Sequence, residues 1–491
     1  MIEESPDTNG APAPPPPTTN IPGTDLPHLK IIPLGGCGQF GLNCTCVQCG
    51  EELLVVDCGM MLPGHDMPGV DVVFPDLTYL SLHRDKIKGY LLTHGHEDHL
   101  GAIPFALELA PAPVFGTPFT LGMLQNRLND HVVPVQADAQ PIHPGERLKL
   151  SDSFTVEPIA VAHSIPESVA YALKTPSGCI VITGDYKMEA TDAGPDRSTD
   201  IQRLHELGES GVDLLLGDST NALVPGLAGT EDDVSECLAQ TFATSPGGIF
   251  VSLFSTHVAR IQTICNLSRR FNRKIAIDGR SLQKVVELAK KLDLLDLPYH
   301  QMVPVTSIES TPRKNLTVLL TGSQGEPRSA LTRLAMQAHN QLSLEPGDTV
   351  VLSARVVPGR EKQVDRMVDR LYRQGAAVVD NRFGDKVHVS GHGHKEDLSR
   401  MIQLLRPRAV LPIHGRYRMQ MEHANIARRG GTDQVVIPDN GSIIKLTREG
   451  LQIEGHTPVG HVLVDGKSVG DVEMPVLRAR RALAHMGMVV A

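Results

Sequence analysis

The stretch Thr93–Ala102 reads THGHEDHLGA and contains four potential metal ligands within six residues: His94, His96, Asp98 and His99. It follows the apolar run Gly89–Leu92, which predicts a short buried strand that ends where the histidines begin. Neutral imidazole and carboxylate groups at this spacing are typical ligands of zinc or a similar divalent ion, and alternate positions on a turn can face two ions. A polar loop rich in histidine is the alternative, but four ligand side chains beside turn glycines favour a metal site.

Composition and charge exclude several classes of protein. The chain has 491 residues, of which 41% are hydrophobic and 21% charged, enough for two or three domains with their own cores. No apolar run reaches the length of a membrane helix, and no signal-like segment opens the chain, so we expect a cytoplasmic protein without membrane contact. Eight scattered cysteines argue against a disulfide framework.

The net charge of -10 argues against a polyanionic partner for the chain as a whole. Local charge differs, because residues 231–380 carry 19 lysines and arginines against 16 aspartates and glutamates. A basic groove can therefore coexist with acidic metal ligands and an acidic surface.

The pattern along the chain suggests five segments. Residues 1–26 hold a proline-rich run and predict a disordered tail, because such a segment cannot bury a core. Within 230–380, helical patterns at 231–241 and 258–270 alternate with strand patterns at 248–254 and 274–277. This alternation predicts a small α/β domain with a parallel sheet, which interrupts the metal-binding domain and forms the second wall of a groove. The expected domains are a tail (1–26), the metal domain (27–229 and 381–478), the insert (230–380) and a second tail (479–491).

Four cysteines lie close together near the start of the metal domain: Cys37, Cys44, Cys46 and Cys49. A zinc ribbon would need a second pair of cysteines, and none follows. Cys44 and Cys46 also alternate as the inward face of a strand does. We therefore expect these thiols to be part of the core.

Other polar residues stand at the ends of apolar strand patterns. Thr155–Ala162 precedes His163, and Gly178–Gly184 precedes Asp185, so both side chains can converge with His94 and His96 at one edge. A histidine at a strand end is usually structural, but two histidines that need a third nitrogen ligand reverse that expectation for His163. Asp57 also ends a strand pattern, and we expect it to orient a ligand imidazole rather than to bind metal.

Further motifs follow in order: LLLGDSTN at 214–221, AIDGRS at 276–281, LLTGSQGEPRSAL at 319–331, HVSGHGHKEDL at 388–398 and PIHGRYR at 412–418. Together with Asp57, HGHEDH at 94–99, His163 and Asp185, this series resembles the ribonuclease J family, in the β-CASP branch of the metallo-β-lactamase superfamily. The resemblance runs from about residue 29 to the end of the chain. It implies an α/β fold, a metallo-β-lactamase αββα sandwich interrupted by an inserted α/β β-CASP domain.

The resemblance also implies roles for the polar residues. One metal ion would be held by His94, His96 and His163, a second by Asp98, His99 and His414, and Asp185 would bridge them. Asp218, His392 and His414 would be the three β-CASP motifs, and Asp98, Asp218 and His392 would be catalytic. Two divalent ions are therefore expected, zinc first, with manganese or magnesium as alternatives.

Substrate contacts are expected from both domains. In the metal domain, the glycine-flanked segment His388, Val389, Ser390, Gly391 and His392 offers amides to a terminal phosphate. In the insert, Arg260, Arg280 and Arg328 are candidates to grip phosphates, and Arg280 with Thr256 and His257 is the preferred set. The loop Ser255–His257 departs from the family, whose members usually carry an asparagine there.

The expected function is a metal-dependent ribonuclease that degrades RNA from a 5′ monophosphate end and also cuts internally, in RNA maturation and decay. Metal-bound water is the expected nucleophile, and His392 would serve the leaving 3′ oxygen. A hydrolase of small thioesters or lactams, a DNA nuclease of the same fold and a catalytically silent subunit are the alternatives. His414 favours RNA, since DNA-acting relatives tend to have valine there. The resemblance implies a homodimer or larger assembly, although this sequence ends at Ala491, where family members commonly continue into a C-terminal domain that aids dimerisation.

Overall fold

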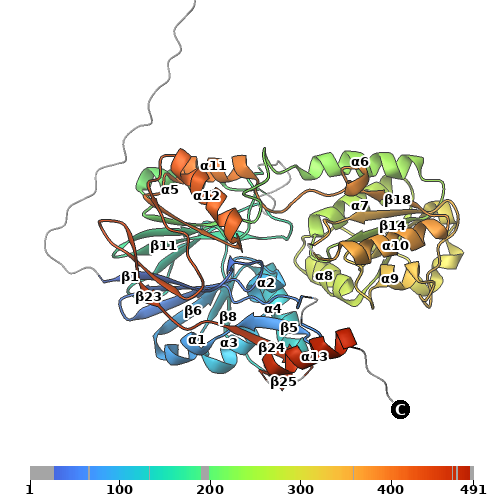
Figure 1. Cartoon of the computed structure of the whole chain (residues 1–491). Coiled ribbons are helices and arrows are strands. Elements are labelled where there is room, and N and C mark those ends of the chain that lie inside the picture. Colours follow the sequence, from blue (N-terminus) through green and yellow to red (C-terminus); the bar gives the residue numbers. More distant parts are fainter. Residues whose placement is uncertain are drawn as a thin grey trace, which may run out of the picture.

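Two β-sheets packed face to face form the larger part of the molecule, and a second lobe lies beside them (Figure 1). The computed structural model describes residues 27–64, 67–131, 133–189, 198–357, 359–466, 468–470 and 474–486. The tail expected at 1–26 and the last residues of the tail expected at 479–491 lie outside the described residues.

The first sheet has the strand order β23 (Leu451–His456), β22 (Ser442–Leu446), β1 (Leu29–Gly35), β3 (Cys44–Cys49), β4 (Glu52–Val56), β6 (Ile87–Leu91), β7 (Val114–Gly116) and β8 (Ala139–Pro141). The second has the order β21 (Gln434–Val435), β19 (Ala409–Ile413), β13 (Leu214–Asp218), β12 (Gly178–Ile182), β11 (Val169–Thr175), β10 (Thr155–Ala160) and β9 (Leu148–Lys149). Alternating apolar residues of both sheets, such as Val47, Leu54, Leu173 and Leu216, form the core between them.

Helices cover the two outer faces. The first sheet is covered by α1 (Thr78–Leu82), α3 (Ile103–Leu109) and α4 (Pro118–Asp130), whose apolar sides bury the outward-facing residues of that sheet. The second is covered by α5 (Ile201–Ser210), α11 (Lys395–Leu405) and α12 (Tyr417–Arg429). The result is the αββα sandwich that the resemblance implied.

The insert enters after β13 and leaves before β19, two strands that pair in parallel within the second sheet. Its own sheet has the order β15 (Lys274–Asp278), β16 (Leu316–Leu320), β14 (Ile249–Leu253), β17 (Thr349–Ser353) and β18 (Ala377–Asp380), and every pairing is parallel. One face packs on α6 (Glu231–Thr244), α7 (Val258–Arg270) and α8 (Arg280–Lys291), the other on α9 (Ala330–Ala335) and α10 (Glu361–Arg373). The predicted α/β insert with a parallel sheet is confirmed.

The insert is attached to the sandwich through apolar and polar contacts. Phe119 at the start of α4 and Ile165 belong to the same buried cluster as Val258 and Leu282 of the insert. At the edge of this contact, the Lys284 ammonium lies 2.9 Å from the Asp130 carboxylate. The apolar junction therefore fixes the position of the insert relative to the strand ends of the sandwich.

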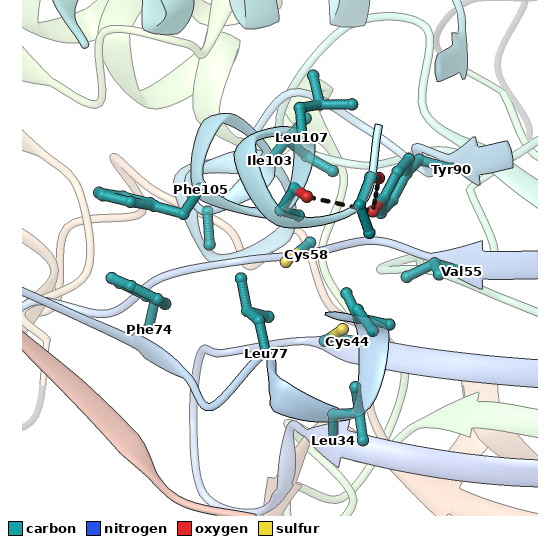
Figure 2. Packing of buried hydrophobic residues seen from close by; sticks show 14 of the residues in the cluster. Leu34, Cys44, Val55, Cys58, Phe74, Leu77, Tyr90, Ile103, Phe105 and Leu107 are labelled. Carbon is teal, nitrogen blue, oxygen red and sulfur yellow. Dashed lines mark hydrogen bonds between the residues drawn. The ribbon is translucent and has the colours of Figure 1, made fainter. Parts of the chain in front are cut away.

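The cysteines of the first sheet are buried as free thiols. Cys44 and Cys46 point to the helix-covered face, and Figure 2 shows Cys44 and Cys58 among Leu34, Leu77 and Ile103. Cys49 points the other way, into the core between the sheets. In the same region Tyr90 donates from its hydroxyl to the Ala110 carbonyl at 2.7 Å (Figure 2). The core interpretation is confirmed for Cys44, Cys46 and Cys49.

Smaller elements complete the fold: β2 (Cys37–Gly38) pairs with β20 (Gly415–Arg416), β5 (Val72–Pro75) with β24 (His461–Asp465), and β24 with β25 (Ser468–Val469). The helix α13 (Met474–Met486) follows, and Leu477 on it packs on Leu463 of β24. Among the helices that the structure describes, none is both long and apolar enough to cross a membrane.

Candidate metal centre

Six polar residues stand at or just beyond the carboxyl ends of strands. They are Asp57 after β4, His94 after β6, His163 after β10, Asp185 after β12, Asp218 at the end of β13 and His414 after β19. The strands β4 and β6 are parallel, and so are β12, β13 and β19, so that their ends meet at one edge of the sandwich. Asp57 and His414 both adopt positive φ angles of 59° and 49°, which turn the chain sharply at this edge.

One set of donors contains His94, His96, His163 and Asp185, with ligand atoms within 4.8 Å of one another. Nδ1 of His96 lies 3.0 Å from Nε2 of His94 and 3.2 Å from Nε2 of His163. Oδ2 of Asp185 lies 3.6 Å from Nε2 of His94 and 3.7 Å from Nε2 of His163. His96 is the N-cap residue of the short helix α2 (Glu97–Leu100), and His99 lies within that helix.

A second set contains Asp98, His99, Asp185 and His414. Nε2 of His99 lies 3.2 Å from Oδ2 of Asp185, and Nε2 of His414 lies 3.5 Å from Oδ2 of Asp98. Nδ1 of His414 lies 2.8 Å from Oδ1 of Asp185. Asp185 is therefore shared by the two sets that the sequence suggested.

In three of the rings, the nitrogen that faces away from the centre, here called the outer nitrogen, has a defined hydrogen-bond partner. Nδ1 of His163 donates to the Gly391 carbonyl at 2.8 Å, since a carbonyl can only accept. Nδ1 of His99 lies 2.7 Å from Asp57, and Nδ1 of His94 lies 3.0 Å from the Thr93 hydroxyl, which itself donates to Asp57. His94 and His163 thus turn an unprotonated Nε2 toward the centre, as metal-binding imidazoles do. Burial opposes protonation of His99, but the charges of Asp185 and Asp57 raise the pKa of that ring well above its usual value.

The charge balance of the centre also fits a cation. Burial lowers the pKa of His94 and His163, and that of His96 to about 4, so these rings are neutral donors at pH 7. Oδ1 of buried Asp185 makes no hydrogen bond of acceptable geometry within the described residues, although Nδ1 of His414 lies 2.8 Å away. In the same described residues, the carboxylates of Asp98, Asp185 and Asp218 form ion pairs only with histidines, and none with lysine or arginine. Such a set of buried carboxylates and lone pairs suits divalent metal ions.

His392 and Asp218 stand beside the two sets. Nδ1 of His392 lies 2.8 Å from Oδ2 of Asp218 and 3.8 Å from Oδ2 of Asp185. Asp185, Asp218, His392 and His414 make a third group of donors close enough to hold an ion. His392 therefore lies close enough to serve either as a catalytic residue or as a metal ligand.

The segment before His392 is held by a residue that the sequence analysis did not single out. The Asn221 amide donates to Oγ of Ser390 at 2.8 Å and to the His392 carbonyl at 3.2 Å. Its own oxygen accepts from Arg355, which reaches across from the loop after β17 of the insert. Asn221 closes the motif LLLGDSTN, so its position in that motif was the available signal. Arg355 is exposed and had no such signal.

The side chains of the insert that were expected to contact substrate do not all face the groove. Arg260 is fully buried and donates to Glu231, Ser353 and the Val387 carbonyl, so the hypothesis that it grips phosphates is wrong. His257 is 2% exposed and lies 3.3 Å from Glu231, which removes it from the surface of the groove. Arg280 and Arg328 are exposed, and neither bonds to the metal centre within the described residues. Thr256 does reach the centre, with Oγ1 at 3.2 Å from Nε2 of His96.

His388 and Val389 begin the segment that ends at His392. Both are partly buried, and Nδ1 of His388 has no hydrogen-bond partner among the described residues. Burial lowers the pKa of His388 well below its usual value, so the ring is neutral. Val389 packs against the insert core and against Gly229.

Comparison with known proteins agrees with this arrangement. Residues 37–216 match the metallo-β-lactamase superfamily, residues 246–371 the β-CASP domain of ribonuclease J, and residues 384–438 the Zn-dependent metallo-hydrolase RNA specificity domain. Ribonuclease J of Thermus thermophilus is 37% identical over 471 residues, covering 94% of this chain and 82% of that protein. The chain belongs to the ribonuclease J family.

Further relatives in the ribonuclease J family show similar coverage. Ribonuclease J2 of Bacillus subtilis is 37% identical over 94% of this chain and 83% of that protein. Ribonuclease J of Mycobacterium tuberculosis H37Rv is 37% identical over 90% of this chain and 79% of that protein. A crystal structure of a protein of unknown function from Enterococcus faecalis V583 aligns with a TM-score of 0.62 at 14% identity, over 85% of this chain and all of that one, and shows the fold alone.

Proposed function

We propose that this chain is a metal-dependent ribonuclease that hydrolyses RNA phosphodiesters as a 5′ to 3′ exonuclease with endonuclease activity, in RNA maturation and decay. The observation that carries the proposal is the convergence of two donor sets on Asp185 at the edge that faces the insert. Membership of the ribonuclease J family and the match of residues 384–438 to an RNA specificity domain support RNA as the substrate.

The metal ligands we propose are His94, His96 and His163 for one ion and Asp98, His99 and His414 for the other, with Asp185 between them. Two such ions, when bound, supply a water of lowered pKa as nucleophile and a clamp on the oxygens of the scissile phosphate. Zinc is our first choice because imidazole and carboxylate donors suit it, and manganese or magnesium are the alternatives. Asp57 holds the His99 ring in place through its hydrogen bond to Nδ1.

We propose that His392 donates a proton to the leaving group. Its Nδ1 hydrogen bond to Asp218 fixes the ring, which leaves Nε2 available to hold a proton for the departing 3′ oxygen. Asp218 also stabilises the charged form of that ring. Although burial opposes protonation, the charges of Asp218 and Asp185 raise the pKa of His392 above its usual value.

We place the pocket for a 5′ monophosphate at Ser390 and Gly391. Among the described residues, the backbone amides of Ser390 and Gly391 have no hydrogen-bond partner. The His392 amide, in contrast, donates to Oγ of Ser390. Gly391 packs closely on His163, since a Cβ there would lie 2.8 Å from that ring. Two free amides beside the metal centre suit a terminal phosphate, and Arg355 supplies a nearby positive charge.

The test is cleavage of a 5′-labelled RNA and of a DNA of the same sequence, each with chelator and after return of zinc, manganese or magnesium. We expect mononucleotides from the RNA with a 5′ monophosphate, slower release from the triphosphate form, and no cleavage with chelator. A chain that leaves RNA intact but hydrolyses a thioester or lactam would overturn the proposal in favour of a small-molecule hydrolase. Equal rates on monophosphate and triphosphate RNA would contradict the pocket alone.

A further inference from the structure

His96 differs from its neighbours in the partner of its outer nitrogen. The outer nitrogens of His94, His99 and His163 are held by Thr93, Asp57 and Gly391, which all belong to the sandwich. The outer nitrogen of His96 is Nε2, and within the described residues its partner is Oγ1 of Thr256 at 3.2 Å. Thr256 lies 160 positions later, in the insert.

The loop that carries Thr256 is held firmly. It joins β14 to α7, and the His257 amide donates to the Phe254 carbonyl while the Val258 amide donates to the carbonyl of Thr256 itself. His257 caps α7 by accepting from the Arg260 amide at 3.4 Å, and its ring is buried against Glu231. These contacts give the Thr256 side chain a defined direction.

The apolar junction between the lobes sets the distance from Thr256 to His96. Val258, two residues beyond Thr256, belongs to the buried cluster that also contains Phe119 and Ile165 of the sandwich. Ile165 follows His163 by two positions, so the junction reaches to the edge of the metal centre. A shift of the insert by about 1 Å would break the Thr256 contact, because N–H···O hydrogen bonds have donor–acceptor distances of about 2.7 to 3.2 Å.

We propose that Thr256 is a positioning residue for the metal centre, and this proposal rests on the proposed function above. Its hydroxyl accepts the proton on Nε2 of His96, which leaves Nδ1 as the lone pair directed toward Nε2 of His94 and His163. The insert therefore supplies a part of the metal site as well as the wall of the groove. Metal affinity becomes linked to the seating of the insert on the sandwich.

The test compares Thr256→Val, which keeps the shape and removes the hydroxyl, with Thr256→Ser, which keeps the hydroxyl. Zinc binding is measured by competition with a coloured chelator, and the site geometry by the visible absorption of the cobalt-substituted protein. Thr256→Val should bind one of its two ions about 10- to 100-fold more weakly and change the cobalt spectrum, as expected for loss of a group that orients a ligand. Thr256→Ser should stay within about threefold of the parent in affinity, since the hydroxyl is retained.

Thr263→Val is the matched control, because the Thr263 hydroxyl is bonded within α7 to the Ala259 carbonyl at 3.2 Å and lies away from the metal residues. It should leave affinity and spectrum unchanged. Parent-like affinity and spectrum in Thr256→Val would overturn the positioning role while leaving the ribonuclease proposal intact. A weakening in Thr256→Ser equal to that in Thr256→Val would also overturn it, since packing would then be the cause. Failure of the parent chain to bind metal would instead refute the metal centre itself.

Discussion

Two buried groups of histidines and carboxylates in this chain differ in the charge that balances them. In the insert, Arg260 donates from Nε and Nη2 to both oxygens of Glu231 at 2.7 and 2.8 Å, with His257 beside them. Nη1 of the same guanidinium donates to Ser353 and to the Val387 carbonyl. Every donor named here has a partner, and the carboxylate has its cation.

Within the described residues, the metal centre has the same residue types without a lysine or arginine to pair with its carboxylates. Its carboxylates face imidazoles, and Oδ1 of Asp185 makes no hydrogen bond of acceptable geometry in the described structure. The comparison teaches that a buried His and carboxylate cluster is structural where an arginine neutralises it and functional where only a ligand from solution can do so.

The largest effect is expected for Asp185→Asn. Asp185 belongs to all three donor groups, so replacing its charge by a neutral amide removes the shared ligand of both ions. We expect the variant to bind neither metal tightly and to show no RNA cleavage above background. Elemental analysis and the labelled RNA assay measure the two effects.

Asp152→Asn is the control for Asp185→Asn, since the Asp152 side chain is exposed and pairs with Lys149 on the surface. It should keep both metals and full activity. Two equivalents of metal retained by Asp185→Asn would contradict the shared ligand, and the comparison of the two clusters with it.

His392→Ala and His414→Ala sharpen the distinction within the metal centre. If His392 serves the leaving group, its loss should lower kcat by about 10² to 10⁴ and leave both metals bound. His414→Ala should lower metal occupancy as well, and excess metal should restore part of its activity by mass action. The two variants are compared by kcat, metal content and activity at increasing metal concentration.

The reverse result would exchange the two roles. The third donor group makes this outcome chemically reasonable, because His392 and His414 both face Asp185 and Asp218. Unchanged RNA cleavage in both variants would remove the β-CASP residues from the reaction.

The sequence could predict that these polar side chains cluster because most of them follow strands. A polar residue at the carboxyl end of an apolar run is visible in the chain, and parallel neighbours bring such ends together whatever the rest of the fold. Family motifs added His392 and His414. The parallel sheet of the insert was predictable from periodicity, and the sandwich was implied by the resemblance to the family.

The contacts between the lobes could not be predicted in this way. Arg260 and His257 stand beside a loop that faces the groove, and only the side-chain directions show that they turn inward to Glu231. Arg355 meets Asn221 across 134 positions of sequence, and Thr256 meets His96 across 160. These pairs depend on how two separately folded units pack, which no local pattern records.

Arg260→Met tests the structural cluster of the insert, in which Arg260 neutralises Glu231. It leaves the partly buried Glu231 carboxylate without its cation, and because breaking a fully buried pair costs about 3 to 5 kcal/mol, we expect a loss of stability at or below the lower end of that range. Metal content should stay at the parent value in protein that remains folded. Adding Glu231→Gln to Arg260→Met removes the uncompensated charge and should restore part of the loss, which urea unfolding of the single and double variants measures.

The same pair predicts a dependence on pH. Burial raises the pKa of Glu231, but the charges of His257 and Arg260 outweigh it and hold that pKa well below the usual value. A depressed carboxyl pKa stabilises the fold above the pKa of the unfolded state, about 4.3, and this stability is lost as pH falls through the folded pKa. The double variant lacks this carboxyl, so its unfolding free energy should fall less than that of the parent on acidification below about pH 4.3. An equal fall would contradict the assignment.

The smallest effect is expected for Cys46→Ala, which tests the cysteines as a third group of potential ligands. Cys46 is fully buried on the helix-covered face of the first sheet, and burial raises its thiol pKa well above the usual value. A thiol held in its neutral form is a packing group rather than a zinc ligand, since zinc binds the thiolate. The substitution should therefore cost about 1 kcal/mol in urea unfolding and remove no metal. Loss of a third ion from the variant would show a zinc ribbon after all, and charge balance would then fail to distinguish the metal-binding clusters of this chain from its structural ones.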